Sequence, residues 1–307
     1  MSAGGSKRAV FAALLANLGI AIAKFAGFAI TGSSSMLAEG VHSVADTGNQ
    51  LLLLLGGRRS KQAPDDEHPF GYGRERYFWA FVVSIVLFAL GSVFAIFEGV
   101  EKLLHPHTVE SPGVAIAILL VAVVLEGFSF RTAVHESNPL RQGASWAQFI
   151  RRAKAPELPV LLLEDSGALV GLVIALTCLL LTVVTGSPTW DGIGSTLIGL
   201  LLGAIAIVLA TEMKSLLIGE SASDDDQQAI RAAIEDAPRV LGVIHLRTEH
   251  LGPEELLVGI KVDFDPTLTF AELAVAIDDG EQRIRTAVPS ARVIYIEPDV
   301  ARVPPES

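Results

Sequence analysis

Cysteine is nearly absent from this chain of 307 residues, in which Cys178 is the only one. A single thiol excludes intrachain disulfides and cysteine-rich metal sites, and its place in an apolar run predicts that it simply packs. Basic residues are scarce too: the chain has 23 lysines and arginines but 34 acidic residues, which gives a formal charge of −11. This charge argues against nucleic acid as a partner.

Apolar residues are abundant instead. They make up 50% of the chain, and the mean hydropathy of +0.49 is too high for a soluble domain of this size. Spanning a bilayer takes about 20 mostly apolar residues. Six runs qualify, at roughly 9–31, 34–56, 77–101, 113–134, 159–184 and 191–212. The sequence therefore predicts an α-helical, multi-pass membrane protein with six transmembrane helices in the lipid bilayer.

Basic residues are distributed unequally between the connecting segments. They precede the first run, follow the sixth, and cluster in the connections after the second and fourth runs, whereas the opposite loops hold one lysine, Lys102. By the positive-inside rule, both termini are cytoplasmic. The first run lacks a cleavage pattern, so we interpret it as a retained helix. The short N-terminus without an Arg/Ser-rich leader favours a bacterial plasma membrane.

The composition changes after Ser221. An amphipathic helix starting at Asp224, strands at 240–248 and 256–264, a helix at 270–288 and a strand at 292–297 follow in the order αββαβ. This order suggests a small α+β domain on the cytoplasmic side. The sequence thus divides into a six-helix membrane domain at residues 1–219 and a cytoplasmic domain at 220–307.

Two of the apolar runs carry charge at membrane depth. The second holds Glu39, His42 and Asp46, and the fifth holds Glu164 and Asp165. A carboxylate at this depth costs on the order of 3 kcal/mol, so such groups persist where they face a cavity, a partner or an ion.

The spacing of these residues favours a metal site. His42 and Asp46 are four residues apart and share one helical face, and Asp165 can approach from another helix. Nitrogen with oxygen donors suits Zn²⁺ and tolerates Co²⁺, Cd²⁺, Fe²⁺ or Mn²⁺. Glu39 extends the same face as a supporting group. Glu164 points about 100° away from Asp165 and is either a ligand or an interhelical partner.

The same residues suggest exchange of metal for protons. Carboxylates facing each other in a low dielectric repel, so the metal-free site should hold protons, which an arriving metal ion displaces. The alternative is a structural polar cluster that joins the second and fifth helices. No enzyme is predicted, because no nucleophile or metal-activated water motif accompanies these residues.

Two sequence motifs identify a family. The motifs are GSSSMLAEGVHSVAD at 32–46 and DDEHPFGYGRE at 65–75, and the six runs and the αββαβ tail accompany them. Together they resemble the cation diffusion facilitator family, and LEDS at 163–166 resembles its zinc transporter nine branch. The resemblance implies a Y-shaped homodimer with a ferredoxin-like regulatory and dimerisation domain, and proton-coupled export of Zn²⁺ from the cytosol. A metal sensor or scaffold without transport, and export of Mn²⁺, Fe²⁺ or another divalent ion, are the alternatives.

The chain departs from the family pattern at three places. Relatives carry a ligand four residues before the fifth-helix aspartate, where this chain has Leu161, so Glu164 or water is left to fill the fourth place. A loop site between the second and third helices keeps Asp65 and His68 but has Tyr72 as its third residue, so a solvated acidic loop without metal is the alternative there. In the tail, metal-ligand positions hold Lys261 and Ile296, and His245 near another is interpreted as strand surface, so no binuclear metal site is predicted there.

Overall fold

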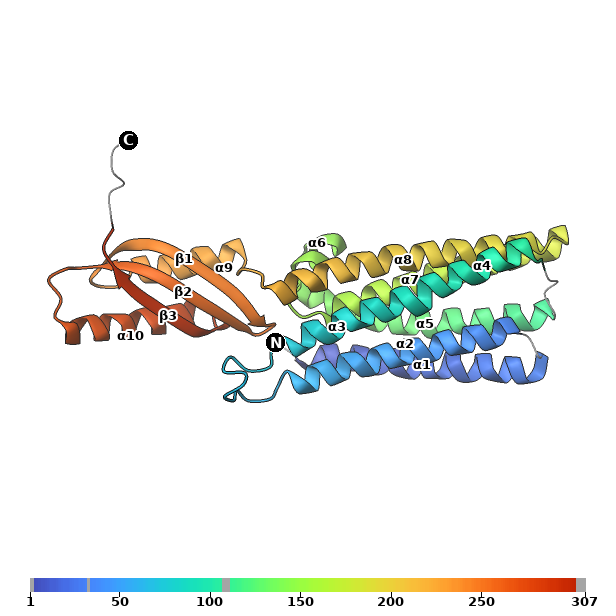
Figure 1. Ribbon diagram of the computed structural model, residues 1–307, viewed down its shortest axis with the longest axis horizontal. Coiled ribbons are helices and arrows are strands. Elements are labelled where there is room, and N and C mark those ends of the chain that lie inside the picture. The colour runs from blue at the N-terminus through green and yellow to red at the C-terminus, as the bar shows by residue number, and fades with distance from the viewer. Residues whose placement is uncertain (1–2, 32–33, 107–110, 302–307) are drawn as a thin grey trace, which may run out of the picture. The chain divides into compact units, whose positions relative to one another are not determined.

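The computed structural model describes residues 3–31, 34–106 and 111–301 (Figure 1). Within them, the side chains of 3–9, 12–13, 27–28, 30–31 and 34–42 are not described. The chain forms two compact units. The first comprises residues 1–60 and 75–214, and the second comprises 61–74 and 215–307.

The first unit is helical. Its elements are α1 (Ala3–Thr31), α2 (Ser34–Arg59), α3 (Glu75–Val86), the π-helix η1 (Leu87–Val93), α4 (Phe94–Leu104), α5 (Pro112–Arg141), the short α6 (Trp146–Arg152), α7 (Glu157–Thr185) and α8 (Thr189–Ile218). Helix α1 packs against α2 and α5, and α5 packs against α7.

Four helices in the described part of the chain are long and apolar enough to cross a membrane. They are Glu75–Leu104, which joins α3, η1 and α4, and α5, α7 and α8. These four confirm the third to sixth predicted runs and mark an integral membrane protein. The first two runs coincide with α1 and α2. In the described residues of α1, the apolar stretch is Leu14–Ala26, which is shorter than a membrane span. The total of six therefore stays a prediction.

Small residues let α8 approach its neighbours closely. A Cβ atom added to Gly199 would lie 2.6 Å from Cγ1 and 2.8 Å from the backbone nitrogen of Ile96 in α4. The Ile205 side chain of α8 occupies the space that a Cβ atom at Gly167 of α7 would need. In a bilayer, where apolar side chains gain little from leaving lipid, such close backbone approach supplies the packing energy between helices.

The second unit has the predicted αββαβ order. Its elements are α9 (Asp224–Glu235), β1 (Val240–Gly252), β2 (Glu255–Phe264), α10 (Phe270–Ala287) and β3 (Ala291–Asp299). The sheet order is β1-β2-β3, with β1 and β2 antiparallel and β2 and β3 parallel. Strand β2 buries every second residue from Leu256 to Phe264, as its alternation predicts. These side chains form a core with Ile230 and Ile234 of α9 and Ile284 of α10.

The segment 61–74 belongs to this second unit. Arg74 forms an ion pair with Glu249 of β1. The Cα atom of Gly252 would lie 3.1 Å from a Cβ atom added to Gly73, so only glycine allows the backbone of this segment to lie so close to the end of β1.

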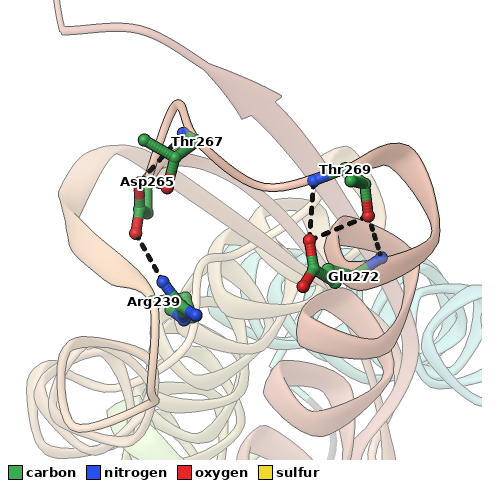
Figure 2. Close-up of polar contacts among 5 residues, drawn as sticks. All are labelled: Arg239, Asp265, Thr267, Thr269 and Glu272. Atoms are coloured by element: carbon green, nitrogen blue, oxygen red, sulfur yellow. Dashed lines mark hydrogen bonds and ion pairs between the residues drawn. The ribbon is translucent and has the colours of Figure 1, made fainter.

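Two carboxylates fix the start of α10 and the turn before it (Figure 2). Asp265 accepts hydrogen bonds from the hydroxyl and backbone N–H of Thr267 and from Arg239. Glu272 accepts from the backbone N–H and hydroxyl of Thr269, and the Thr269 hydroxyl accepts from the Glu272 N–H, which forms a capping box. These bonds hold the pKa of both carboxyls below their ordinary values, through Thr267 and Arg239 for Asp265 and through Thr269 for Glu272.

The lowered pKa values predict acid sensitivity of the second unit. A carboxylate whose pKa is lower in the folded state stabilises that state above its unfolded pKa, about 3.9 for Asp and 4.3 for Glu. The stabilisation is lost as the pH falls through the folded value. We expect hydrogen exchange of α10 amides in the full chain, corrected for intrinsic rates, to stay slow from pH 7 to 5 and to accelerate below about pH 4.

The control is the double variant Asp265→Asn/Glu272→Gln, which has no charge to lose at either position. Its protection in α10 should be lower than that of the wild type at pH 7 and should change less on acidification. Equal acid sensitivity of the two proteins would contradict the assignment.

Candidate functional site

A cavity of about 90 Å³ lies within the helices of the first unit. It is lined by residues of α1, α2, η1, α5, α7 and α8. Its polar lining residues are Asn17, Lys24, Ser43, Asp46, Gln50, Glu126, Glu164 and Asp165, and the remaining lining residues are apolar or glycine. The volume is enough for several water molecules. Polar groups that are costly in a membrane thus gather around one space in the bundle.

Four of the lining residues are acidic. Asp46 comes from α2, Glu126 from α5, and Glu164 and Asp165 from α7. Glu126, Glu164 and Asp165 are only 6%, 8% and 2% exposed, whereas Asp46 is half-buried. Such a concentration of buried carboxylates is expected where protons or a cation neutralise the charge.

Hydrogen bonds fix the carboxyl groups of Asp165 and Glu164. Ser129 of α5 donates to Oδ2 of Asp165 at 2.8 Å. Asn49 donates to one oxygen of Glu164 at 2.8 Å, and Gln50 donates to the other at 3.3 Å. Glu164 thus ties α7 to α2 through both of its oxygens, which is the interhelical role that the sequence left open beside a ligand role.

A buried lysine shares the cavity with these acids. Lys24 of α1 is 6% exposed and donates to the hydroxyl of Ser43 in α2 at 3.0 Å. Its ammonium group brings positive charge among four carboxyl groups. Burial of an ammonium group is tolerated where it is paired with opposite charge or hydrogen-bonded.

The structure brings together part of the predicted site. Asp46, Glu164 and Asp165 line the same cavity. His42 and Glu39 belong to α2, but their side chains are outside the described residues. Among the side chains that are described, no three acidic, histidine or cysteine groups are close enough together to hold one metal ion. Leu161 is fully buried and does not line the cavity.

The residues of the predicted loop site are joined by hydrogen bonds, and metal binding by Asp65 and His68 stays a prediction. Tyr72 donates its hydroxyl to Oδ2 of Asp65 at 2.6 Å, and the backbone N–H groups of Glu67 and His68 donate to Oδ1 at 3.1 and 2.7 Å. These bonds hold the pKa of Asp65 below its ordinary value, the Tyr72 hydroxyl having the largest effect. The His68 ring lies 4.4 Å from the Tyr72 ring. Both oxygens of Asp65 therefore stabilise the loop.

Two tail positions also have evident roles within the second unit. Lys261 pairs with Glu297 at 2.9 Å and with Asp299 at 3.3 Å, and its hydrogen bonds to these two carboxylates raise its pKa. The Nε2 atom of His245 accepts a hydrogen bond from Arg247 at 2.7 Å. The ammonium group of Lys261 repels a metal ion rather than binding it. That the tail holds no binuclear metal site stays a prediction.

Sequence reasoning missed Glu126 and Lys24. Each carried a usable signal, because each is the one charged residue in its apolar stretch, at 113–130 and 9–31 respectively. The criterion that selected Asp46 and Asp165 applies to both. The amides Asn17, Asn49 and Gln50 carried a weaker signal, since an uncharged polar residue is less costly in a helix within the membrane.

Comparison with known proteins identifies the family. Residues 10–218 match the cation efflux transmembrane domain, and residues 222–299 match the cation efflux protein cytoplasmic domain. The chain is 36% identical over 244 residues to the human mitochondrial proton-coupled zinc antiporter SLC30A9, covering 79% of this chain and 43% of that protein. This chain therefore spans less than half of that relative's length.

Two further matches differ in how much they cover. The cation-efflux pump FieF of Escherichia fergusonii is 28% identical over 305 residues, which is 98% of this chain and 95% of the pump. A solved structure, the nickel form of a MamM CTD variant, aligns with 26% of this chain and all of its own, at 20% identity and a TM-score of 0.25. The two domain matches cover most of the chain, and it belongs to the cation efflux family, the cation diffusion facilitators, a family of transporters rather than enzymes.

Proposed function

We propose that this chain exports a divalent transition-metal cation, chiefly Zn²⁺, from the cytosol in exchange for protons, by alternating access. The observation that carries the proposal is the cavity in the helical bundle, lined by Asp46, Glu126, Glu164 and Asp165. His42, one turn before Asp46 on α2, supplies the nitrogen donor that favours Zn²⁺ over Ca²⁺ or Mg²⁺.

The exchange follows from charge balance. Several ionised carboxylates around one small cavity repel one another in a medium of low dielectric constant. A divalent cation relieves this repulsion, and so do protons, but the two compete because carboxylate and imidazole ligands must be deprotonated to bind metal. A cavity that is exposed to one side with metal and to the other with protons therefore couples the two fluxes.

The proposal includes the membrane topology and the dimer. We place six transmembrane helices in the membrane, with α1 and α2 as the first two, and both termini in the cytosol, in a bacterial plasma membrane. The αββαβ unit is proposed as a ferredoxin-like domain through which two copies form a homodimer. The similarity to a human proton-coupled zinc antiporter and to a bacterial cation-efflux pump supports the reaction class.

Reconstitution tests this function directly. The purified chain in proteoliposomes that enclose a metal-sensitive and a pH-sensitive dye should take up Zn²⁺ and release protons in a fixed ratio. Liposomes without protein supply the control. Mn²⁺, Fe²⁺, Co²⁺ and Cd²⁺ in the same assay rank the substrates. Metal binding without uptake would instead identify a membrane-embedded sensor or scaffold.

A further inference from the structure

Glu126 occupies a defined face of α5. The buried residues of this helix are Ala122, Glu126, Ser129, Ala133 and Ser137, which recur every three or four positions and form one stripe. Ser129, three residues after Glu126, donates its hydroxyl to Asp165 of α7. The stripe that carries Glu126 therefore faces α7 at the level of Asp165.

The Glu126 carboxylate lines the cavity, and among the side chains that the structure describes no hydrogen-bond partner reaches it. Its residue is 6% exposed and belongs to the cavity lining. In the part of the chain that the structure describes, no hydrogen bond or ion pair reaches this carboxyl group, whereas Asp165 and Glu164 are both hydrogen-bonded. A buried ionised carboxylate without partners costs several kcal/mol, so this group is expected to hold a proton or to bind a cation that the cavity admits.

The charges around Glu126 come from three helices. Asp165 of α7 and Asp46 of α2 repel its carboxylate, and Lys24 of α1 attracts it. Glu164 of α7 also interacts with it electrostatically. Three acids against one ammonium group leave a net negative surrounding, and a divalent cation in the cavity interacts favourably with each carboxylate.

Helix α7 has no metal-binding side chain one turn before Asp165. A ligand four residues before Asp165 would lie on the same face of α7, but this chain has Leu161 there, fully buried and outside the cavity lining. Helix α7 thus contributes Asp165 without a companion one turn earlier. The adjacent helix α5 brings the unpartnered carboxylate of Glu126 to the same cavity.

We infer that Glu126 binds the transported cation together with Asp165 and determines which cation is accepted. This inference rests on the proposed function and deepens it. The cavity is large enough for several water molecules, so the carboxylate can bind the ion directly or through one retained water. A third carboxylate beside one imidazole makes the donor set richer in oxygen, and oxygen donors suit Mn²⁺ better than imidazole does. Glu126 therefore extends the accepted cations from Zn²⁺ toward Mn²⁺.

Calorimetric titration of the full chain in detergent with Zn²⁺ and Mn²⁺ tests this inference. Glu126→Gln keeps the shape and removes the charge. We expect it to weaken Zn²⁺ binding by about tenfold and Mn²⁺ binding by more, since groups that support a metal site typically contribute 10- to 100-fold in affinity. Glu136→Gln is the matched control, because Glu136 lies on the same helix but not in the cavity lining, and it should bind like the wild type.

The titration and the liposome assay separate the inference about Glu126 from the proposed function. The inference is overturned if Glu126→Gln binds both ions like Glu136→Gln while Asp165→Asn loses binding. If Glu126→Gln does not fold, Glu126→Asp decides, because its shorter side chain should change the ratio of Zn²⁺ to Mn²⁺ affinity, and an unchanged ratio overturns the inference. A wild type that binds metal but exchanges no protons in liposomes overturns the proposed function and leaves the result on Glu126 standing.

Discussion

Asp165→Asn is expected to reduce Zn²⁺-driven proton release from proteoliposomes by about 100-fold or more. Groups that merely support a metal ligand typically contribute 10- to 100-fold in affinity, and a direct ligand should contribute at least as much. Asp165 is 2% exposed, lines the cavity and accepts a hydrogen bond from Ser129. The asparagine amide has nearly the same shape, so it preserves packing while it removes the charge that we propose binds the cation.

Ser129→Ala separates charge from positioning. It removes the hydroxyl that orients Asp165 but leaves the carboxylate in place. We expect a smaller loss, about tenfold, seen mainly as a weaker apparent affinity for Zn²⁺.

Asp46→Asn should behave like Asp165→Asn, because Asp46 lines the same cavity from α2. Full transport by Asp165→Asn in protein that elutes as a single species would refute the assignment of the cavity as the transport site.

The sequence predicted the elements that local pattern controls. The αββαβ tail follows from the strict alternation of Leu256 to Phe264 and from cap residues such as Ser223, whose hydroxyl accepts the Asp226 N–H in the structure. The third to sixth spans follow from length and hydropathy, because a helix of about 20 apolar residues crosses the bilayer and satisfies its own backbone hydrogen bonds there. These signals are contained within one segment at a time.

The cavity depends on contacts between segments, and this part could not be predicted. Asn49 and Gln50 contact Glu164 across more than 100 residues of chain, and Ser129 contacts Asp165 across 36. An amide or hydroxyl within an apolar run does not reveal its partner. The charge of Glu126 in an apolar run was a signal that the sequence prediction did not use, and its proximity to Asp165 depends on how α5 rotates against α7. The contact that shows this rotation is the hydrogen bond of Ser129 to Asp165, and the sequence of α5 alone does not name that partner.

The ion pair between Arg76 and Glu157 leads to the largest expected effect on stability. Arg76 donates through Nε and Nη2 to the two oxygens of Glu157 at 2.6 and 2.7 Å. The pair joins the first turn of α3 to the first turn of α7, and the two side chains are 14% and 7% exposed. A bidentate guanidinium–carboxylate pair of this kind is among the stronger polar contacts.

Arg76→Met is expected to lower the free energy of unfolding by about 3–5 kcal/mol, because it leaves the Glu157 carboxylate buried without its partner. Arg76→Lys should fall between this variant and the wild type, since an ammonium group keeps the charge but loses the two parallel hydrogen bonds. The double variant Arg76→Met/Glu157→Leu should recover most of the loss, since well-packed apolar side chains replace a buried pair at little cost. Reversible unfolding in mixed detergent micelles measures all four proteins. A double variant no more stable than Arg76→Met would mean that Arg76 acts through its packing rather than through this pair.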